Sequence, residues 1–230
     1  MSEPTGEKRD FRVHPKFLAD AIRRQAGTLS KAVLEAVMNA TDAGANIIRI
    51  TTDADGRQIV MDDDGRGFQS RQEIHTWFEC FGQPHEESEQ KVYGTFRMGR
   101  GQLFNFGVNR WRTGDWTMVV DLDKHGLCYV LEDESTTHKG CRIQIDFYRR
   151  LTASDQYQLH RDLSLWCKYA LIDVIYNGKS LSTPAAQQKW DRETPEAYIR
   201  LKATGGLRIY NLGIYVQEKP AHTFGAAGKS

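Results

Sequence analysis

Residues 46–61 hold the strongest single constraint on the fold. Two runs rich in Ile and Val, residues 46–52 and 58–61, flank the dipeptide Asp55-Gly56. An Asp-Gly pair between β-rich runs is typical of the tight turn of a β-hairpin. We therefore expect two antiparallel strands here, and the rest of the fold has to be built around them.

Helical patterns lie on both sides of this hairpin. Thr28 or Ser30 suits the N-cap of the helix that precedes it, and Gly44 suits its end. A later helix has the apolar periodicity of an amphipathic helix. The expected helices span residues 20–25, 30–40, 72–81 and 154–170.

The second half of the chain is mostly β-rich. Between Trp111 and Phe147 we expect an antiparallel meander of three runs. Its separators are Thr113-Gly114-Asp115, Lys124-His125-Gly126 and the stretch 138–140. Two further hairpins are expected, over residues 172–181 with a turn at Asn177-Gly178 and over 197–216 with a turn at Gly205-Gly206. Helices that cluster apart from such strands predict an α+β fold, a two-layer sandwich of helices on a mixed, mostly antiparallel sheet.

Composition narrows the class of protein. The 230 residues are enough for one large core. No apolar run approaches the roughly 20 residues of a membrane span, and the N-terminal MSEPTGEKRD lacks the apolar stretch of a secretory signal. A net charge of +1 gives no overall basic field for nucleic acid. The cysteines are scattered without metal-ligand spacing, at positions 80, 128, 141 and 167. We expect a cytoplasmic protein with reduced thiols and no membrane contact.

The stretch EAVMNATDAG places Glu35, Asn39 and Asp42 on one face of the second helix, because residues three, four and seven apart share a face. One interpretation is a solvated stripe on a surface helix. The other is a polar cavity with a ligand, since the neighbouring residues are almost all apolar and a buried carboxylate needs a partner. Both remain open from the residues alone.

The stretch VMDDDGRGF ends the second strand of the hairpin. Its glycines allow a tight turn and a close approach of the backbone to a ligand. The carboxylate of Asp63 could accept a hydrogen bond from an amino group such as that of adenine. An ordinary acidic turn is the alternative, whereas the spacing does not match an EF-hand calcium loop.

The third stretch, YGTFRMGRGQLFNFG, is a glycine-rich segment that leads into an apolar run. Backbone N–H groups at the start of a helix attract phosphate. Arg97 and Arg100 could add positive charge. The pattern is not the P-loop, because GxxxxGK[ST] is absent.

The order and spacing of the three stretches resemble the GHKL group of Bergerat-fold ATPases, which includes gyrase B, the large heat-shock chaperones, histidine kinases and MutL. The similarity covers roughly residues 11–183, and the lead-in before Glu35 resembles the MutL and chaperone branches. The boxes that match are Glu35-xxx-Asn39 with Asp42-Ala43-Gly44-Ala45, Asp63-x-Gly65-x-Gly67, and Gly99-Arg100-Gly101. One departure is Gly140-Cys141, where many members carry a threonine after the glycine.

The resemblance implies a role for each matched residue. Glu35 would be the general base, Asn39 a Mg²⁺ ligand, and Asp63 the acceptor for the adenine amino group, with Asp42 supporting the adenine side. A single amide ligand is enough for Mg²⁺, which keeps several waters and binds phosphates. The other residues implied at the ATP site are Gly65, Gly67, Phe68, Arg97, Met98, Gly99, Arg100, Gly101, Gln102 and Cys141.

The implied function is Mg²⁺-dependent binding and slow hydrolysis of ATP, coupled to closure of residues 82–98 and to conformational change or ATP-dependent homodimerisation. Two alternatives remain: a nucleotide-gated interaction module without turnover, and phosphotransfer of the histidine-kinase type. Residues 1–183 would form the ATP-binding domain, and residues 184–230 a β-hairpin extension that looks like the start of a second, transducer-like domain. The sequence does not indicate whether the client is a protein or DNA.

Overall fold

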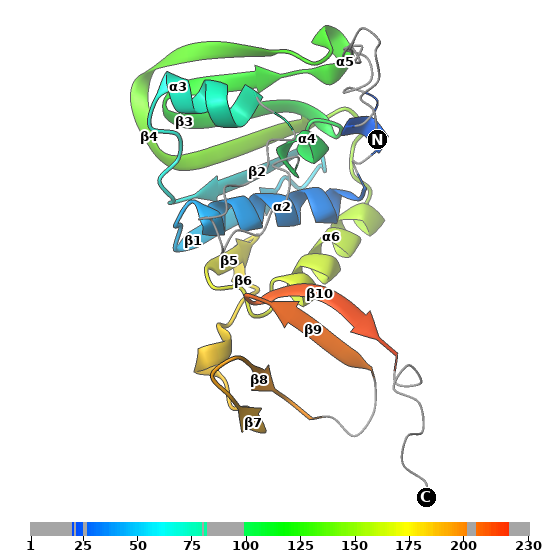
Figure 1. Cartoon of the computed structure of the whole chain (residues 1–230). Helices are drawn as coiled ribbons and strands as arrows, with labels where there is room; N and C mark the ends of the chain where they lie inside the picture. Colours follow the sequence, from blue (N-terminus) through cyan, green and yellow to red (C-terminus); the bar gives the residue numbers. More distant parts are fainter. Residues whose placement is uncertain are drawn as a thin grey trace, which may run out of the picture.

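The computed structural model describes residues 20, 22–24, 27–79, 81, 99–201 and 206–220 (Figure 1). These residues include the helices α2 (Leu29–Asp42), α3 (Arg71–Glu73), the π-helix η1 (Ile74–Glu79), α4 (Gly99–Leu103), α5 (Leu122–His125), α6 (Ala153–Trp166) and the 3₁₀-helix η2 (Ala185–Gln187). The strands are β1 (Ile47–Thr52), β2 (Gln58–Asp63), β3 (Gly107–Val120), β4 (Tyr129–Phe147), β5 (Asp173–Tyr176), β6 (Lys179–Ser180), β7 (Arg192–Glu193), β8 (Tyr198–Ile199), β9 (Leu207–Asn211) and β10 (Ile214–Lys219).

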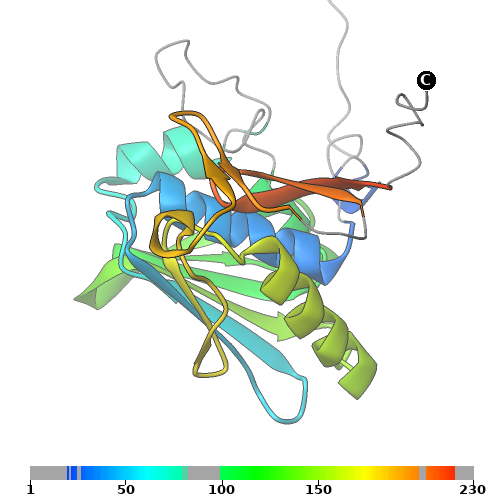
Figure 2. The ribbon, with the colours of Figure 1, turned by 90° about the horizontal axis from the view of Figure 1, so that it is seen from below.

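Six strands form the main sheet, in the order β3-β4-β2-β1-β5-β6. Only the β1–β5 pair is parallel, and the other neighbours are antiparallel. Helices α2 and α6 lie side by side on one face of this sheet (Figure 2). The expected α+β sandwich of helices on a mixed, mostly antiparallel sheet is confirmed.

The core lies between the sheet and these two helices. Every second residue of a strand points to the same face, so β1, β2 and β4 each bury one set of apolar side chains against the helices. Helix α2 buries its small and β-branched residues on the opposite side of this layer. The inward residues include Val33, Val37, Ile48, Ile50, Ile59, Met61, Ile143, Ile145, Leu159 and Leu163.

Local signals set the start of α2 and the turn of the β1–β2 hairpin, as expected. The Thr28 hydroxyl accepts a hydrogen bond from the N–H of Lys31 at 3.3 Å and caps α2. Strands β1 and β2 pair from Ile48↔Asp63 to Thr52↔Ile59, with Asp55-Gly56 in the connection. The hairpin at Asn177-Gly178 also forms, and both residues have the positive φ that this turn type requires.

The meander differs from the expectation of three runs. Residues 107–147 form two long strands, β3 and β4, joined through α5. The stretches 113–115 and 138–140 lie inside these strands, and the β3–β4 register shifts around Gly114. Gly114 has φ +53°, so the chain forms a bulge there and continues in the sheet, where a turn was expected.

The last hairpin also differs from the expectation. It turns at Leu212-Gly213, both with positive φ, while Gly205 lies outside the described residues and Gly206 precedes β9. The amphipathic helix ends at Trp166, four residues before the predicted end, and the helix expected near 72–81 is largely a π-helix. Among the described cysteines, Cys128, Cys141 and Cys167 are free thiols.

The C-terminal hairpin is attached to the main layer by its turn. Ile214 of β10 is buried in the same core as α2 and α6. The hydroxyl of Tyr210 donates to the carbonyl oxygen of Leu165 at 3.2 Å, and its ring lies 4.8 Å from that of Tyr169. None of the described helices combines the length and the apolar character that a membrane crossing requires.

Replacing Ile214 with Ala tests this attachment. The change removes a buried side chain, so we expect the free energy of unfolding to fall by about 2–5 kcal/mol in one cooperative transition. Val216→Ala on the same strand is the control, because Val216 is 54% exposed and should cost about 0.5 kcal/mol or less. Urea titrations of both variants make the comparison. Equal losses would mean that the hairpin does not share the core of the sandwich.

Candidate functional site

Helix α2 carries the first group of predicted site residues. Glu35 is half-buried, whereas Asn39 and Asp42 are exposed near the end of the helix. These three residues therefore lie at the border of the core and not within it, because the buried apolar residues of α2 occupy the opposite side of the helix. Burial raises the pKa of Glu35 above its ordinary value, and the negative charge of Asp42 raises it further. A carboxylate with a raised pKa is a better proton acceptor, which suits a general base.

The three aspartates at the end of β2 have three different surroundings. Asp62 lies on the outer face, where it hydrogen-bonds to His138 and forms an ion pair with Arg142, each at 3.1 Å. Asp64 accepts the backbone N–H groups of Asn46 at 2.7 Å and Ile47 at 3.0 Å, so it fixes the start of β1. These contacts, led by that of Ile47, lower the pKa of Asp64.

Asp63 points to the helix side of the sheet, because successive side chains of a strand alternate between faces. Its Oδ1 accepts the N–H of Gly65 at 2.9 Å and that of Cys141 at 3.4 Å. Burial raises its pKa, although the two N–H groups work in the opposite direction. Within the described part of the chain both hydrogen bonds fall on Oδ1, so Oδ2 remains available as an acceptor for a ligand amino group.

The glycines of the second box serve close packing within the protein. Gly67 has φ +61°, and a Cβ there would lie 2.3 Å from the Thr113 hydroxyl and 2.5 Å from the carbonyl oxygen of Gly140. A Cβ on Gly65 would lie 2.9 Å from the Asp63 carboxylate. Gly67 thus packs closely against the protein's own strands β3 and β4, and the predicted approach of these glycines to a ligand stays a prediction.

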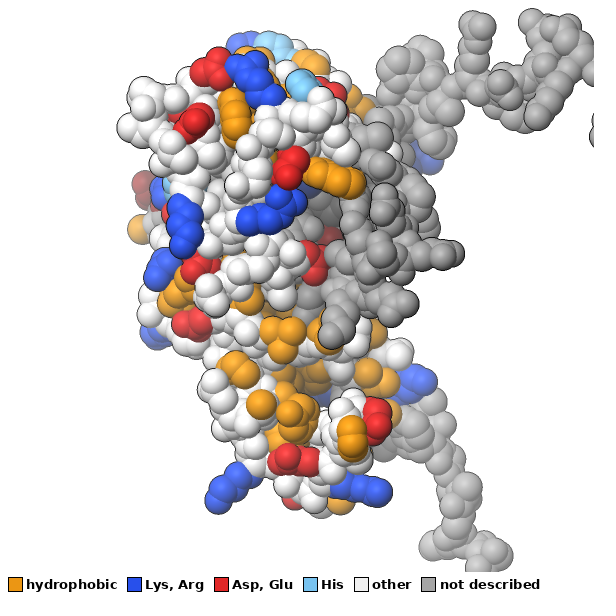
Figure 3. Space-filling view, turned by 60° about the vertical axis from the view of Figure 1, so that its left-hand side comes forward, with side chains coloured by type: hydrophobic (Ala, Val, Ile, Leu, Met, Phe, Trp, Pro, Cys, Tyr) orange, Lys and Arg blue, Asp and Glu red, His pale blue; other side chains and the backbone are white. Residues whose placement is uncertain are grey.

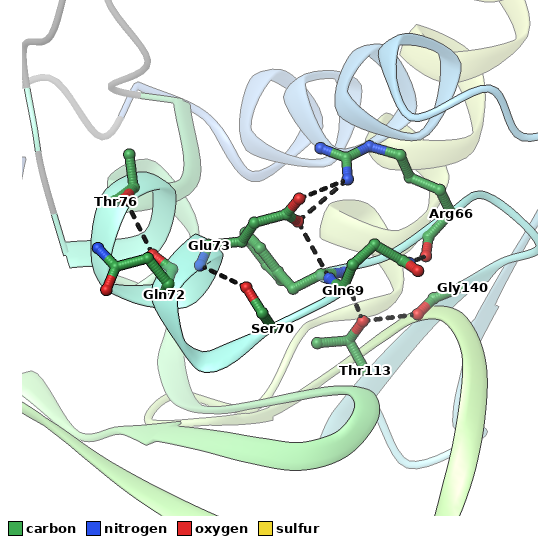
Figure 4. Close-up of polar contacts among 9 residues, drawn as sticks. Arg66, Gln69, Ser70, Gln72, Glu73, Thr76, Thr113 and Gly140 are labelled. Carbon is green, nitrogen blue, oxygen red and sulfur yellow. Dashed lines mark hydrogen bonds and ion pairs between the residues drawn. The ribbon is translucent and has the colours of Figure 1, made fainter.

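The loop from Asp64 to Ser70 is held by its own side chains (Figure 4). Glu73 accepts two hydrogen bonds from Arg66, at 3.0 and 3.1 Å, and one from the N–H of Gln69 at 3.0 Å. Ser70 caps α3 by accepting the N–H of Glu73. The N–H of Arg66 donates to the carbonyl oxygen of Ala43 at 3.0 Å, which ties this loop to the end of α2.

The ring of Phe68, predicted at the ATP site, packs against the core. Its centroid is 6.4 Å from that of Phe78 in an edge-to-face arrangement. Cys141 is partly buried in β4, and burial together with the nearby charges of Asp63 and Asp62 raises the pKa of its thiol. The thiol is therefore protonated at neutral pH and is only a weak hydrogen-bond donor.

The third box forms the short helix α4, which contacts α2. The Nε of Arg100 donates to the carbonyl oxygen of Phe78 at 2.9 Å, and the guanidinium lies 4.1 Å from the centroid of Phe81. A Cβ on Gly101 would lie 2.9 Å from the Phe81 ring. Arg100 thus braces α4 against the segment after η1, and its proposed contact with phosphate stays a prediction.

Gln102, Arg97 and Met98 are the other predicted site residues of this box. The side-chain oxygen of Gln102 is buried and has no hydrogen-bond partner among the described residues. Arg97 and Met98 lie outside the described residues, as does the whole of 82–98.

The sequence did not point to Thr113, which was interpreted as part of a turn. It is fully buried in β3, and its hydroxyl contacts both the loop after β2 and Gly140 of β4. A signal for it exists: Asn109, Trp111 and Thr113 are alternate residues, all buried, so Thr113 continues an inward-facing row. A hollow of about 610 Å³ lies elsewhere, at the opposite end of β2, lined by Asp53, Arg57, Gln58, Asp146, Phe147, Tyr148 and Arg150.

Comparisons with known proteins agree with the geometry. Residues 27–109 match the family described as "Histidine kinase-, DNA gyrase B-, and HSP90-like ATPase". This match spans α2, the β1–β2 hairpin, the loop after β2 and the glycine-rich box. The match supports a GHKL-type ATPase domain in this part of the chain, and such a domain implies ATP binding. A search among curated proteins found no match.

Two solved structures of a topoisomerase ATPase region share the fold. The ATPase region of Saccharomyces cerevisiae topoisomerase II matches with a TM-score of 0.52 at 16% identity, over 68% of this chain and 49% of that one. The same region bound to ICRF-187 (dexrazoxane) matches with a TM-score of 0.51 at 17% identity, over the same shares, 68% and 49%. The N-terminal domain of a DNA repair protein has a TM-score of 0.46 at 20% identity, over 70% of this chain and 55% of that one.

The chain thus spans about half the length of the topoisomerase structures that it matches. At these identities the likeness concerns the fold. The family match and the solved structures do not single out the MutL or the chaperone branch. The assignment to these branches stays a prediction.

The separate role of Asp64 can be tested by stability. Asp64→Ala removes the acceptor of two N–H groups at the start of β1, which are partly accessible to water, so we expect a loss of about 0.5–1.5 kcal/mol at neutral pH. The lowered pKa sets the pH dependence: the stabilisation is present above the ordinary value of 3.8 and disappears as pH falls through the lowered pKa. Denaturant titrations between pH 7 and pH 2 would measure both effects. Asp62→Ala is the control, because partly exposed ion pairs contribute about 0–1 kcal/mol.

Proposed function

We propose that the protein binds ATP with Mg²⁺ and hydrolyses it slowly, and that the nucleotide state drives conformational change or dimerisation. The observation that carries this proposal is the convergence of three sequence motifs on α2. The loop after β2 donates to Ala43 at the end of α2, and α4 contacts the same helix. A candidate base acceptor and a glycine-rich box therefore both adjoin the helix that carries the half-buried carboxylate of Glu35.

The residues present fit such a ligand. Asp63 keeps one carboxylate oxygen available for an amino group, and Asn39 offers an exposed amide oxygen. No cluster of three or more His, Cys, Asp or Glu side chains able to hold a metal occurs among the described residues. A Mg²⁺ ion that keeps several waters and binds phosphates needs only one or two protein oxygens. When bound, it would neutralise charge on the phosphates.

Glu35 has the properties that hydrolysis requires. In its ionised form it would take the proton from the water that attacks the terminal phosphate, and burial makes it more basic than an exposed glutamate. This favours turnover over a module that only changes shape with nucleotide. Because the pKa of Glu35 is raised, the hydrolysis rate should decline with falling pH before an exposed glutamate would titrate.

Residues 184–230 are proposed to begin a second, transducer-like domain, as the resemblance implies. Strands β7–β10 lie apart from the six-stranded sheet, in two separate two-stranded sheets. Hydrophobic side chains gather over the part of the molecule formed by β7–β10 (Figure 3). The exposed ones on these strands include Tyr198, Ile199, Leu207 and Val216. Such a surface suits contact with a further domain or a second copy. The client, protein or DNA, is left open, and a cytoplasmic location is proposed from the use of ATP.

Glu35→Ala separates hydrolysis from binding. We expect turnover to fall by about 10²–10⁴-fold while ATP affinity stays close to that of the wild type. Asn39→Ala should differ, because the loss of a metal ligand weakens Mg²⁺-dependent binding as well as hydrolysis. Phosphate release and calorimetry on the same preparations provide the two readouts. Wild-type turnover by a clean Glu35→Ala preparation would exclude Glu35 as the base, and a wild type without turnover would favour the gated module.

Asp63→Asn tests the adenine site without a change of size. If the amide oxygen keeps the contacts of Oδ1 with Gly65 and Cys141, the new NH₂ group meets the adenine amino group, donor against donor. ATP affinity should fall at least about tenfold, since a hydrogen bond to a charged group contributes about 1.5–3 kcal/mol. Asp62→Asn, one residue earlier on the outer face, should leave affinity unchanged. Calorimetry that finds the two variants equal would remove Asp63 from the adenine site.

A further inference from the structure

Thr113 has a buried hydroxyl on the edge strand of the six-stranded sheet. It lies on β3, is 0% exposed, and is the direct cross-strand partner of Cys141 on β4. Its Oγ1 accepts the N–H of Phe68 at 2.9 Å and donates to the carbonyl oxygen of Gly140 at 2.9 Å (Figure 4). A single side chain therefore joins β3, β4 and the loop after β2.

Each hydrogen-bond partner of Thr113 belongs to a segment that also contacts the Asp63 carboxylate. Gly140 precedes Cys141, whose N–H donates to Oδ1 of Asp63. Phe68 closes the loop that contains Gly65, the second donor to the same oxygen. The Thr113 hydroxyl thus connects the two segments that hold Oδ1 in place.

The packing leaves no room for another arrangement. A Cβ at Gly67 would lie 2.3 Å from Oγ1 of Thr113, and one at Gly140 would lie 2.0 Å from the carbonyl oxygen of Asp63. Without the hydroxyl, the N–H of Phe68 and the carbonyl oxygen of Gly140 would be left at this contact without their partner, which favours displacement of the loop. The thiol of Cys141 is too weak a donor to replace it.

We propose that Thr113 is a positioning residue for adenine recognition. By holding the loop after β2 against Gly140, it keeps Oδ1 of Asp63 engaged by the two backbone N–H groups and turns Oδ2 toward the base. Thr113 itself touches no substrate. This inference rests on the proposed function, because it assigns a specificity role within the same ATP site.

Three variants of the full chain test the proposal. Thr113→Val keeps the shape and removes both hydrogen bonds, and Thr113→Ser keeps the hydroxyl. Thr117→Val is the matched control, because Thr117 is another buried threonine of β3, bonded to Glu134 at 2.6 Å. Calorimetry would measure binding of ADP, GDP and inorganic tripolyphosphate with Mg²⁺, and thermal unfolding would confirm that each variant is folded.

We expect Thr113→Val to weaken ADP binding about tenfold and to reduce the preference for ADP over GDP, with tripolyphosphate affinity unchanged. Thr113→Ser and Thr117→Val should stay within about threefold of the wild type. If Thr113→Val does not fold, Thr113→Cys takes its place with a smaller loss in the same direction, because a thiol makes weaker hydrogen bonds.

Two results would overturn the inference while ATP binding stands: wild-type affinity and base preference in Thr113→Val, or an equal loss for ADP and tripolyphosphate. The second result would indicate a structural role alone. A wild type that binds neither ADP nor ATP would instead overturn the proposed function, and the inference with it.

Discussion

The loop after β2 lies so close to β3 and β4 that residues 67 and 140 have no space for a side chain. The arrangement around Asp63 depends on this contact. It brings the N–H of Cys141 to the carboxylate of Asp63 and buries the hydroxyl of Thr113 between the two segments. Because interiors are densely packed, a displacement at one of these points has to be transmitted to the others. The carboxylate is therefore oriented by backbone and packing together.

The sequence predicted the elements that local signals determine. Thr28 caps α2, the Asp-Gly turn forms the first hairpin, and Asn177-Gly178 forms the second, because each depends on a few neighbouring residues. The bulge at Gly114 was interpreted as a turn, since a glycine with positive φ has the same local signature in both. Pairing with β4 decides between a bulge and a turn, and the local sequence pattern around Gly114 does not show this pairing.

The candidate site shows the same limit. Residue types and spacing selected Asp63 among three consecutive aspartates, but they could not show that Asp62 forms polar contacts on the outer face and Asp64 caps β1. The alternation of faces along β2 separates their roles. Thr113 could not be found from the motif itself, because it lies 50 residues from Asp63 in sequence and is connected to it only through β4 and the loop after β2. Buried polar residues at alternate positions were the signal for it.

The two ends of the proposed nucleotide site differ in how they are held. The adenine side is fixed by a buried network around Asp63, whereas α4 on the other side is braced by Arg100 against Phe78 and Phe81. Helix α2 contacts α4 and, through Ala43 at its end, the loop after β2, and it carries Glu35. The helix therefore links both sides of the proposed site to the proposed general base. The pKa of Glu35 is raised by its burial and by the charge of Asp42, so a change in either would change the basicity of this carboxylate.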